Sequence, residues 1–199
     1  MTHGPADFAQ PAQLPPGQRR ADFWRANHYG RVPCIDLTTW SLAIEGATRG
    51  GEVTRLRWQD IERLPRVEVT ADFHCASRRS VQDVRWSGVA ARSVLDLAPP
   101  AGGARFALAY GAYGYNASVR VDDLLSPRAL FATHVDGEPL TPEHGWPLRL
   151  VLPHLYGWKG PKWMLSLEYL TEPRRGFWEQ RGYHLVGDVW REERYAHQE

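Results

Sequence analysis

The sequence is poor in cysteine. It has 199 residues but only two cysteines, Cys34 and Cys75. Two cysteines cannot form a disulfide framework, and these two lack the C-x-x-C spacing that is typical of zinc sites and haem attachment. A disulfide between them is disfavoured in a reducing compartment. Cysteine chemistry in this chain therefore reduces to what a single thiol can do.

Net charge and long hydrophobic runs are lacking as well. The 24 lysines and arginines nearly balance the 23 acidic residues, which gives a formal net charge of +1. So small a charge exerts no long-range attraction on nucleic acid or an anionic membrane surface. No apolar run approaches the roughly 20 residues of a membrane span. The N-terminal stretch MTHGPADFAQPAQLPPGQRR has no apolar signal core. We therefore expect a cytoplasmic protein that does not bind nucleic acid and has no membrane span.

Several common catalytic and nucleotide-binding motifs are missing too. The sequence contains no G-x-x-x-x-G-K-[ST], H-E-x-x-H or G-x-S-x-G, and the glycines of residues 111–118 lack the G-x-G-x-x-G order. These gaps argue against the usual nucleotide-binding, metalloprotease and hydrolase classes.

Turn-forming and aromatic residues are abundant instead: 18 glycines, 15 prolines and 9 tryptophans. Their spread along the chain favours a strand-rich fold with many irregular loops. We predict an α+β fold in which strands dominate a mixed sheet, the helices are short and the loops are long. Residues 1–20, rich in proline and glutamine, are expected to form a flexible arm, and residues 21–199 a single domain.

The hydrophobic pattern places the elements of this domain. Strands are predicted at 40–46, 66–74, 104–111, 148–153 and 163–170, helices at 56–65, 89–98 and 176–184, and a strand-to-helix passage at 117–125. The last helix is expected to end at Gly182.

The stretch DFHCASRRS carries the most informative cysteine. Cys75 follows the predicted strand 66–74, and Arg78 and Arg79 come soon after it. Nearby arginines favour a thiolate, which is either a nucleophile or a soft metal ligand. A buried cysteine acting as a small hydrophobic side chain, with two solvated arginines, is the competing interpretation. His74 is a poor general base for Cys75, because neighbouring strand residues point to opposite faces.

A second group of residues is suited to anion binding. Arg149 lies in the most apolar predicted strand, so its guanidinium needs an ion pair, an exit from the core, or an anionic ligand. The turn formed by Gly160 and Pro161 lies between Lys159 and Lys162, and it combines backbone amides with ammonium groups. An ordinary strand connection would have the same composition.

Six segments in order resemble the molybdopterin-binding oxidoreductase domain of the sulfite oxidase family, especially its short stand-alone bacterial members. The segments are NHYGRVP, VEVTADFHC, CASRRS, YNAS, DGEPLTPEHGWPLRLVLPHLYGWKGPKW and GFWEQRGYH. The resemblance runs from about residue 15 to residue 195 and covers most of the chain.

The resemblance implies a role for particular residues. Cys75 matches the family's molybdenum-ligating cysteine, and Arg78 and Arg79 match arginines that would orient an anionic substrate. The implied contacts to a Mo-molybdopterin cofactor are Asn27, His28, Tyr110, His144, Arg149, Gly160, Pro161 and Lys162.

The implied activity is oxygen-atom transfer to or from a small, sulfur-containing substrate. The cofactor would carry the redox chemistry while the protein positions it, and an external electron donor or acceptor would complete turnover. Two alternatives remain: a molybdopterin-binding module without turnover, and an enzyme that uses Cys75 as a nucleophile.

Overall fold

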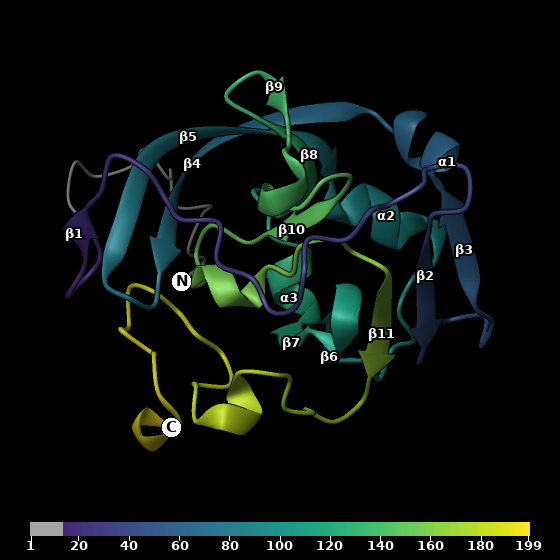
Figure 1. The fold of residues 1–199 in the computed structure, drawn as a ribbon. Coiled ribbons are helices and arrows are strands. Elements are labelled where there is room, and N and C mark those ends of the chain that lie inside the picture. The colour runs from purple at the N-terminus through teal and green to yellow at the C-terminus, as the bar shows by residue number, and fades with distance from the viewer. Residues whose placement is uncertain (1–13) are drawn as a thin grey trace, which may run out of the picture.

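Residues 14–199 are described by a computed structural model in which two β-sheets, three short helices and long connecting segments surround one main core (Figure 1). Most of the predicted N-terminal arm, residues 1–13, lies outside the described residues. Its last part is placed: Arg19 and Arg20 form a short strand that pairs with the first sheet.

The first sheet is built around one long strand, β5. Its strands run in the order β1-β5-β8-β10, with β4 also paired to β5 and β9 to β8. Their bounds are β1 Arg19–Arg20, β4 Arg66–Cys75, β5 Arg79–Ala90, β8 Leu130–Val135, β9 Glu138–Pro139 and β10 Arg149–Val151. All of these pairings are antiparallel except that between β1 and β5.

The second sheet has five strands in the order β3-β2-β11-β6-β7, and β11 runs parallel to β2. Its strands are β2 Ser41–Gly46, β3 Thr54–Arg57, β6 Phe106–Tyr110, β7 Asn116–Arg120 and β11 Ser166–Leu170. Both sheets therefore mix parallel and antiparallel pairs, and the predicted strand-dominated α+β class is confirmed.

The helices are short. The α-helices are α1 Trp58–Glu62, α2 Ala91–Leu97 and α3 Val121–Leu124, and the 3₁₀ turns are η1 Ala112–Gly114, η2 Pro142–His144, η3 Gly157–Lys159, η4 Glu179–Arg181 and η5 Ala196–Gln198. Gly182 ends η4 with a φ of 91°, a left-handed conformation that suits glycine. None of the helices in residues 14–199 has the length and apolar character needed to cross a membrane.

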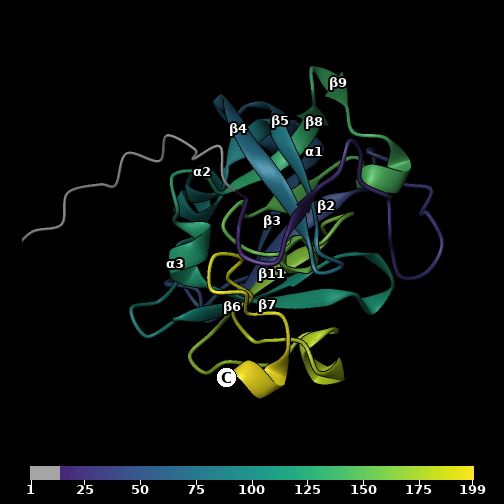
Figure 2. The ribbon, with the colours of Figure 1, turned by 90° about the vertical axis from the view of Figure 1, so that its left-hand side faces the viewer.

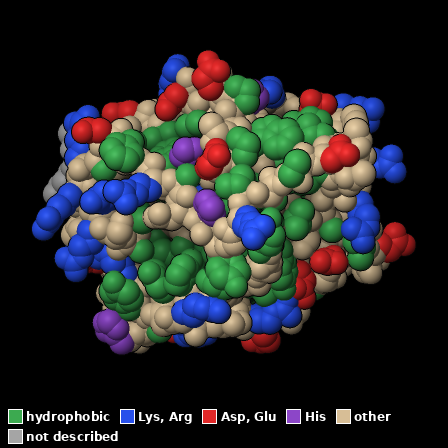
Figure 3. Space-filling view, in the orientation of Figure 1, with side chains coloured by type: hydrophobic (Ala, Val, Ile, Leu, Met, Phe, Trp, Pro, Cys, Tyr) green, Lys and Arg blue, Asp and Glu red, His purple; other side chains and the backbone are tan. Residues whose placement is uncertain are grey.

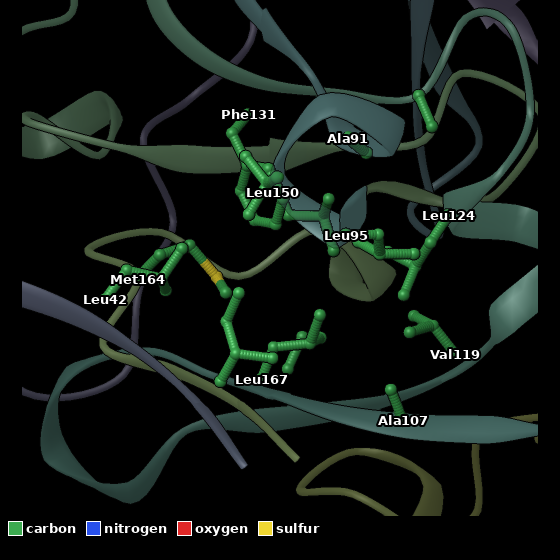
Figure 4. Close-up of a cluster of buried hydrophobic side chains, with 14 of the residues drawn as sticks. Leu42, Ala91, Leu95, Ala107, Val119, Leu124, Phe131, Leu150, Met164 and Leu167 are labelled. Carbon is green, nitrogen blue, oxygen red and sulfur yellow. The ribbon is translucent and has the colours of Figure 1, made fainter. Parts of the chain in front are cut away.

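The main core joins the two sheets through α2 and α3. Figure 4 shows Phe131 and Leu150 of the first sheet packed toward Leu95 of α2, with Leu167 of the second sheet below them. All four side chains are almost completely buried. Burying such side chains contributes roughly 1.5–3 kcal/mol each, so this core fixes the relative position of the sheets.

A smaller apolar cluster lies on the first sheet, beneath the predicted site. Trp86 and Val151 are buried there, and Phe73 and Trp24 pack against the cluster. The Trp24 and Trp86 rings stack with centroids 5.0 Å apart. This stacking attaches the segment between β1 and β2 to the sheet, and Figure 1 shows that segment crossing the front of the molecule.

The three predicted helices are all shorter than expected. The helix expected at 56–65 is α1 Trp58–Glu62, because Leu56 and Arg57 belong to β3, and within 176–184 only the 3₁₀ turn η4 forms. The helix expected at 89–98 begins at Ala91, because Val89 and Ala90 are the last residues of β5. Their backbones pair with β8, so sheet pairing overrides the local helical pattern.

Candidate active site

Five segments meet around a cavity of about 450 Å³, a size typical of ligand pockets. Its wall comes from residues 24–29, from the end of β4 and the turn after it, from Tyr115 between β6 and β7, from residues 144–163, and from residues 178 and 183 of the C-terminal segment. Figures 1 and 2 show the tip of the β4–β5 hairpin beside this C-terminal segment. Residues far apart in sequence therefore share one cavity.

Cys75 is the last residue of β4 and lines this cavity. The turn after it is closed by a hydrogen bond from the Arg78 amide to the Cys75 carbonyl, 3.1 Å long. Ser77 donates its hydroxyl to the Cys75 Sγ over 3.1 Å. Cys75 is half-buried and not disulfide-bonded. A hydrogen-bonded thiol at the wall of a cavity is suited to ligand or metal binding.

The neighbouring His74 belongs to a different environment. Its side chain is buried, and Nδ1 lies 2.8 Å from the Ser80 Oγ. Burial lowers the pKa of His74 to about 4. His74 does not line the cavity, so strand alternation separates it from the Cys75 thiol.

Arg149 faces the cavity from the start of β10. It is only 4% exposed, and Nη1 donates to the His144 carbonyl over 3.1 Å. Its guanidinium lies 5.2 Å from the Trp86 ring centre and 5.4 Å from that of Phe73. Nε has no hydrogen-bond partner, and no carboxylate of residues 14–199 forms an ion pair with the group. A buried cation with an unused donor is suited to an anionic ligand.

Two further basic groups lie near Arg149. Lys162 lines the cavity and donates Nζ to the Glu143 carbonyl over 2.7 Å. Burial, and then repulsion from Arg149, lowers the pKa of Lys162 to about 7. Burial lowers the pKa of His144, and the positive charges of Arg149 and Lys162 lower it further. Together Arg149, Lys162 and His144 form a basic cluster that an anion would stabilise.

The turn between β10 and β11 places the two lysines noted in the sequence, Lys159 and Lys162, in different environments. Lys159 is fully buried and donates to Glu179 over 2.6 Å and to the Leu185 carbonyl over 2.6 Å. Lys162 instead faces the cavity. Gly160 lies against the Leu150 carbonyl, which a Cβ would approach to 2.3 Å. This close approach requires glycine and fixes the turn against β10.

The segment between β1 and β2 supplies Asn27 and His28, both exposed and both in the cavity wall. The His28 ring packs edge-on against Trp163, with centroids 5.4 Å apart. His28 Nδ1 lies 3.0 Å from the Gly30 carbonyl. These contacts hold the segment over the turn that carries Lys162.

Seven of the eleven residues named from the sequence share the cavity: Asn27, His28, Cys75, His144, Arg149, Gly160 and Lys162. The other four lie outside its lining. Arg78 and Arg79 are exposed on the hairpin tip, and Pro161 is buried, where its carbonyl accepts the Leu150 amide. Tyr110 donates its hydroxyl to Glu168 over 2.9 Å and accepts from Arg174.

Sequence reasoning missed the aromatic wall of the cavity. Tyr115, Trp158, Trp178 and Tyr183 all line it. Tyr115 donates to the Trp158 carbonyl over 2.6 Å, and the Trp158 and Trp178 rings both contact Tyr183. Tyr115 and Trp158 lie in residues 111–118 and 156–163, which were noted for their glycines, but no role was predicted for the two aromatic rings. The wall adds flat, mostly apolar surfaces to the cavity that also holds the basic cluster.

Comparison with known proteins identifies the class. Residues 29–178 match the family described as the oxidoreductase molybdopterin binding domain. The match covers well over half of the chain, so the protein belongs to this family.

Individual relatives agree with this assignment. The chain is 36% identical over 188 residues to an uncharacterized oxidoreductase, YuiH, of Bacillus subtilis, and the match covers 94% of each chain. It is 29% identical to sulfite oxidase of Arabidopsis thaliana and 28% identical to the mitochondrial sulfite oxidase of Rattus norvegicus. Those two matches cover 82% and 81% of this chain but only 50% and 34% of the relatives.

A solved structure supports the same fold. The sulfane dehydrogenase SoxCD of Paracoccus pantotrophus matches with a TM-score of 0.66 and 22% identity, over 73% of this chain and 42% of the other. The protein is thus a molybdopterin-binding oxidoreductase domain related to the sulfite oxidases.

The cavity residues fit the cofactor that the family binds. A molybdopterin carries a phosphate, for which the unpaired Nε of Arg149 and the Lys162 ammonium are suitable donors. Cys75 offers a soft sulfur ligand to a metal in the same cavity. Gly160 keeps the turn beside the basic cluster free of a side chain.

Proposed function

We propose that this chain holds a Mo-molybdopterin cofactor and catalyses oxygen-atom transfer to or from a small, sulfur-containing substrate. One observation carries the proposal: the Cys75 thiol and the basic cluster of Arg149, Lys162 and His144 line the same cavity. Its approximate volume of 450 Å³ suits a small organic cofactor. The relation to sulfite oxidases supports the reaction type.

The protein's own residues bind and orient the cofactor in this account. Arg149 and Lys162 bind the phosphate of the pterin, and Cys75 supplies one sulfur ligand to the metal. Ser77 stabilises the thiolate by its hydrogen bond to Sγ. When bound, the cofactor supplies the two-electron chemistry of oxygen-atom transfer.

The aromatic wall receives the substrate in this account. Trp158, Trp178 and Tyr183 offer apolar ring surface, and Tyr183 lies in the same cavity wall as Cys75. The roles inferred for Arg78, Arg79 and Tyr110 are not included, because their side chains do not line the cavity.

The test compares cofactor content and turnover in three proteins made in a molybdate-supplied host. Wild type and Cys34→Ser should contain molybdenum and pterin in similar amounts, since Cys34 is exposed and outside the cavity. Cys75→Ser should keep much of the pterin but lose turnover with sulfite or small sulfoxides. Full turnover in Cys75→Ser would contradict the ligand role, and wild type with cofactor but no turnover would indicate a silent binding module.

A further inference from the structure

Four arginines come together at the tip of the β4–β5 hairpin, outside the cavity. The parallel pairing of β1 with β5 places Arg19 opposite Arg79, and the Arg19 amide donates to the Arg78 carbonyl over 2.9 Å. Arg20 follows on β1. All four side chains are exposed. Arg19 and Arg79 point to one side of the sheet and Arg20 to the other, so the positive charge surrounds this edge of the sheet. We call Arg19, Arg20, Arg78 and Arg79 the arginine face.

The arginine face has no ion-pair partner in the described chain. None of its four side chains forms an ion pair with any residue of 14–199, whereas Arg63, Arg174 and Arg175 elsewhere on the surface do. Like charges directly opposite each other in a sheet are destabilising. The whole chain has a net charge of only +1, so this is a local concentration of positive charge. Such a surface favours an acidic partner.

The arginine face borders the candidate metal ligand, Cys75. Arg79 is the direct cross-strand partner of Cys75, which places their Cα atoms about 4.5–5.5 Å apart. The Arg78 amide also bonds to the Cys75 carbonyl, as does the Gln18 side chain over 3.3 Å. In Figure 3, blue side chains gather at the left edge of the molecule, where Figure 1 shows β1 and the hairpin tip. A partner bound there would lie close to Cys75.

We propose that the arginine face is the docking surface for a small acidic electron-transfer protein. The inference rests on the proposed function, because an oxidoreductase must exchange its electrons with a second redox partner. Oxygen-atom transfer moves two electrons, so a one-electron carrier docks twice in each turnover. Nucleic acid or an anionic lipid surface would also be attracted by four arginines, but neither accepts or supplies electrons, and the position of the face beside Cys75 favours the carrier.

The experiment measures binding of the full-length holoprotein to an acidic [2Fe–2S] ferredoxin as the probe. Arg19→Glu/Arg20→Glu reverses two charges of the face without touching a cavity residue. Arg55→Glu/Arg57→Glu makes the same charge change on β3, in the other sheet, where both side chains are exposed. We expect the first variant to weaken binding at low salt by at least about tenfold and the second by less than about twofold.

The neutral variant Arg19→Gln/Arg20→Gln should lie between wild type and the glutamate variant. Raising the salt from about 50 to about 300 mM should weaken wild-type binding strongly, because exposed charges are screened. Equal loss in the two glutamate variants, or no binding by wild type, would overturn the docking surface. The proposal would also be overturned if the protein bound phosphatidylglycerol vesicles or duplex DNA through Arg19 and Arg20 but did not bind ferredoxin.

Molybdenum and pterin are measured in the same preparations to keep the two proposals apart. A preparation that fails to load cofactor but binds ferredoxin through Arg19 and Arg20 would count against the proposed function and support the docking surface. A protein that contains cofactor and is active, but whose ferredoxin binding is unchanged by either pair of glutamate substitutions, would support the proposed function and contradict the docking surface.

Discussion

Arg149 and Cys75 line one cavity although they lie on β10 and β4, two strands that do not pair with each other. Each comes from the first sheet, where β5 and β8 separate the two strands. The sheet thereby places a thiol and a buried guanidinium around the same space. Four predictions about residues that hold this arrangement, and one about the metal itself, follow from it.

Replacing Arg149 should separate ligand binding from stability. Arg149→Met keeps an unbranched apolar stem but removes the guanidinium, so the anion loses charge-assisted hydrogen bonds worth about 1.5–3 kcal/mol each. We expect pterin content to fall by about tenfold or more. The free energy of unfolding of the cofactor-free protein should stay within about 1 kcal/mol of wild type or rise, because an unpaired charge has left the core. The control is Arg63→Met, at the exposed C-terminal end of α1. Loss of stability with unchanged pterin content would assign Arg149 a structural role only.

Cofactor retention should depend on pH through Lys162. Its pKa of about 7 means that the ammonium is charged at pH 6 and largely neutral at pH 8. The charged form binds an anion, so the affinity for the cofactor should be lower at pH 8 than at pH 6. In the cofactor-free protein, the stability changes with pH in the opposite direction from cofactor binding. The unfolded lysine keeps its proton up to a pKa of about 10.5, so above pH 7 the unfolded state binds more protons and the free energy of unfolding rises with pH.

Lys162→Met tests this pH dependence directly. The variant should bind the cofactor with similar affinity at the two pH values, and more weakly than wild type at pH 6. A variant that keeps the wild-type difference between pH 6 and pH 8 would assign the effect to another group, with His144 the next candidate because its pKa is also lowered.

The buried pair of Lys159 and Glu179 should dominate the attachment of the C-terminal segment. The ammonium and the carboxylate oxygen are 2.6 Å apart and both side chains are inaccessible to solvent. Glu179 also accepts the Ser118 amide over 3.0 Å. Lys159→Met leaves a buried carboxylate without its cation and should cost about 3–5 kcal/mol of unfolding free energy. In urea unfolding, the double variant Lys159→Met/Glu179→Leu should lose clearly less than the sum of the single variants. Additive losses would contradict the pairing.

The hydroxyl of Ser77 should activate the Cys75 thiol. A hydrogen bond donated to sulfur stabilises the thiolate, which is the reactive form. In a Cys34→Ser background without cofactor, Ser77→Ala should slow alkylation of Cys75 by roughly two- to fivefold at neutral pH. Ser77→Thr keeps a hydroxyl and should restore the rate. Equal rates in the alanine variant and wild type would show that the contact has no electronic effect on the thiol.

Much of the fold was predictable wherever a single local pattern dominated. The alternating side chains of residues 66–74 predicted β4, and the apolar run around Arg149 predicted β10. The same run made a buried guanidinium conspicuous, so Arg149 and Lys162 could be named as candidate anion-binding residues without a structure. Gly182 ended its 3₁₀ turn as expected.

The rest depended on contacts between distant segments. β5 was not predicted, because its charged residues and a register shift between Ser87 and Gly88 blur the alternation. The pairing of Arg19 with Arg79 joins residues 60 positions apart and has no local signal. The aromatic wall was missed for the same reason: Trp158 and Tyr183 meet only after the C-terminal segment folds back over the sheet.

The central claim is that the sulfur of Cys75 binds molybdenum in this cavity. X-ray absorption at the molybdenum edge counts the sulfur neighbours of the metal in wild type, Cys34→Ser and Cys75→Ser. The account predicts equal sulfur coordination in wild type and Cys34→Ser, and one sulfur fewer in Cys75→Ser with the pterin still present. Identical sulfur coordination in all three proteins would contradict it.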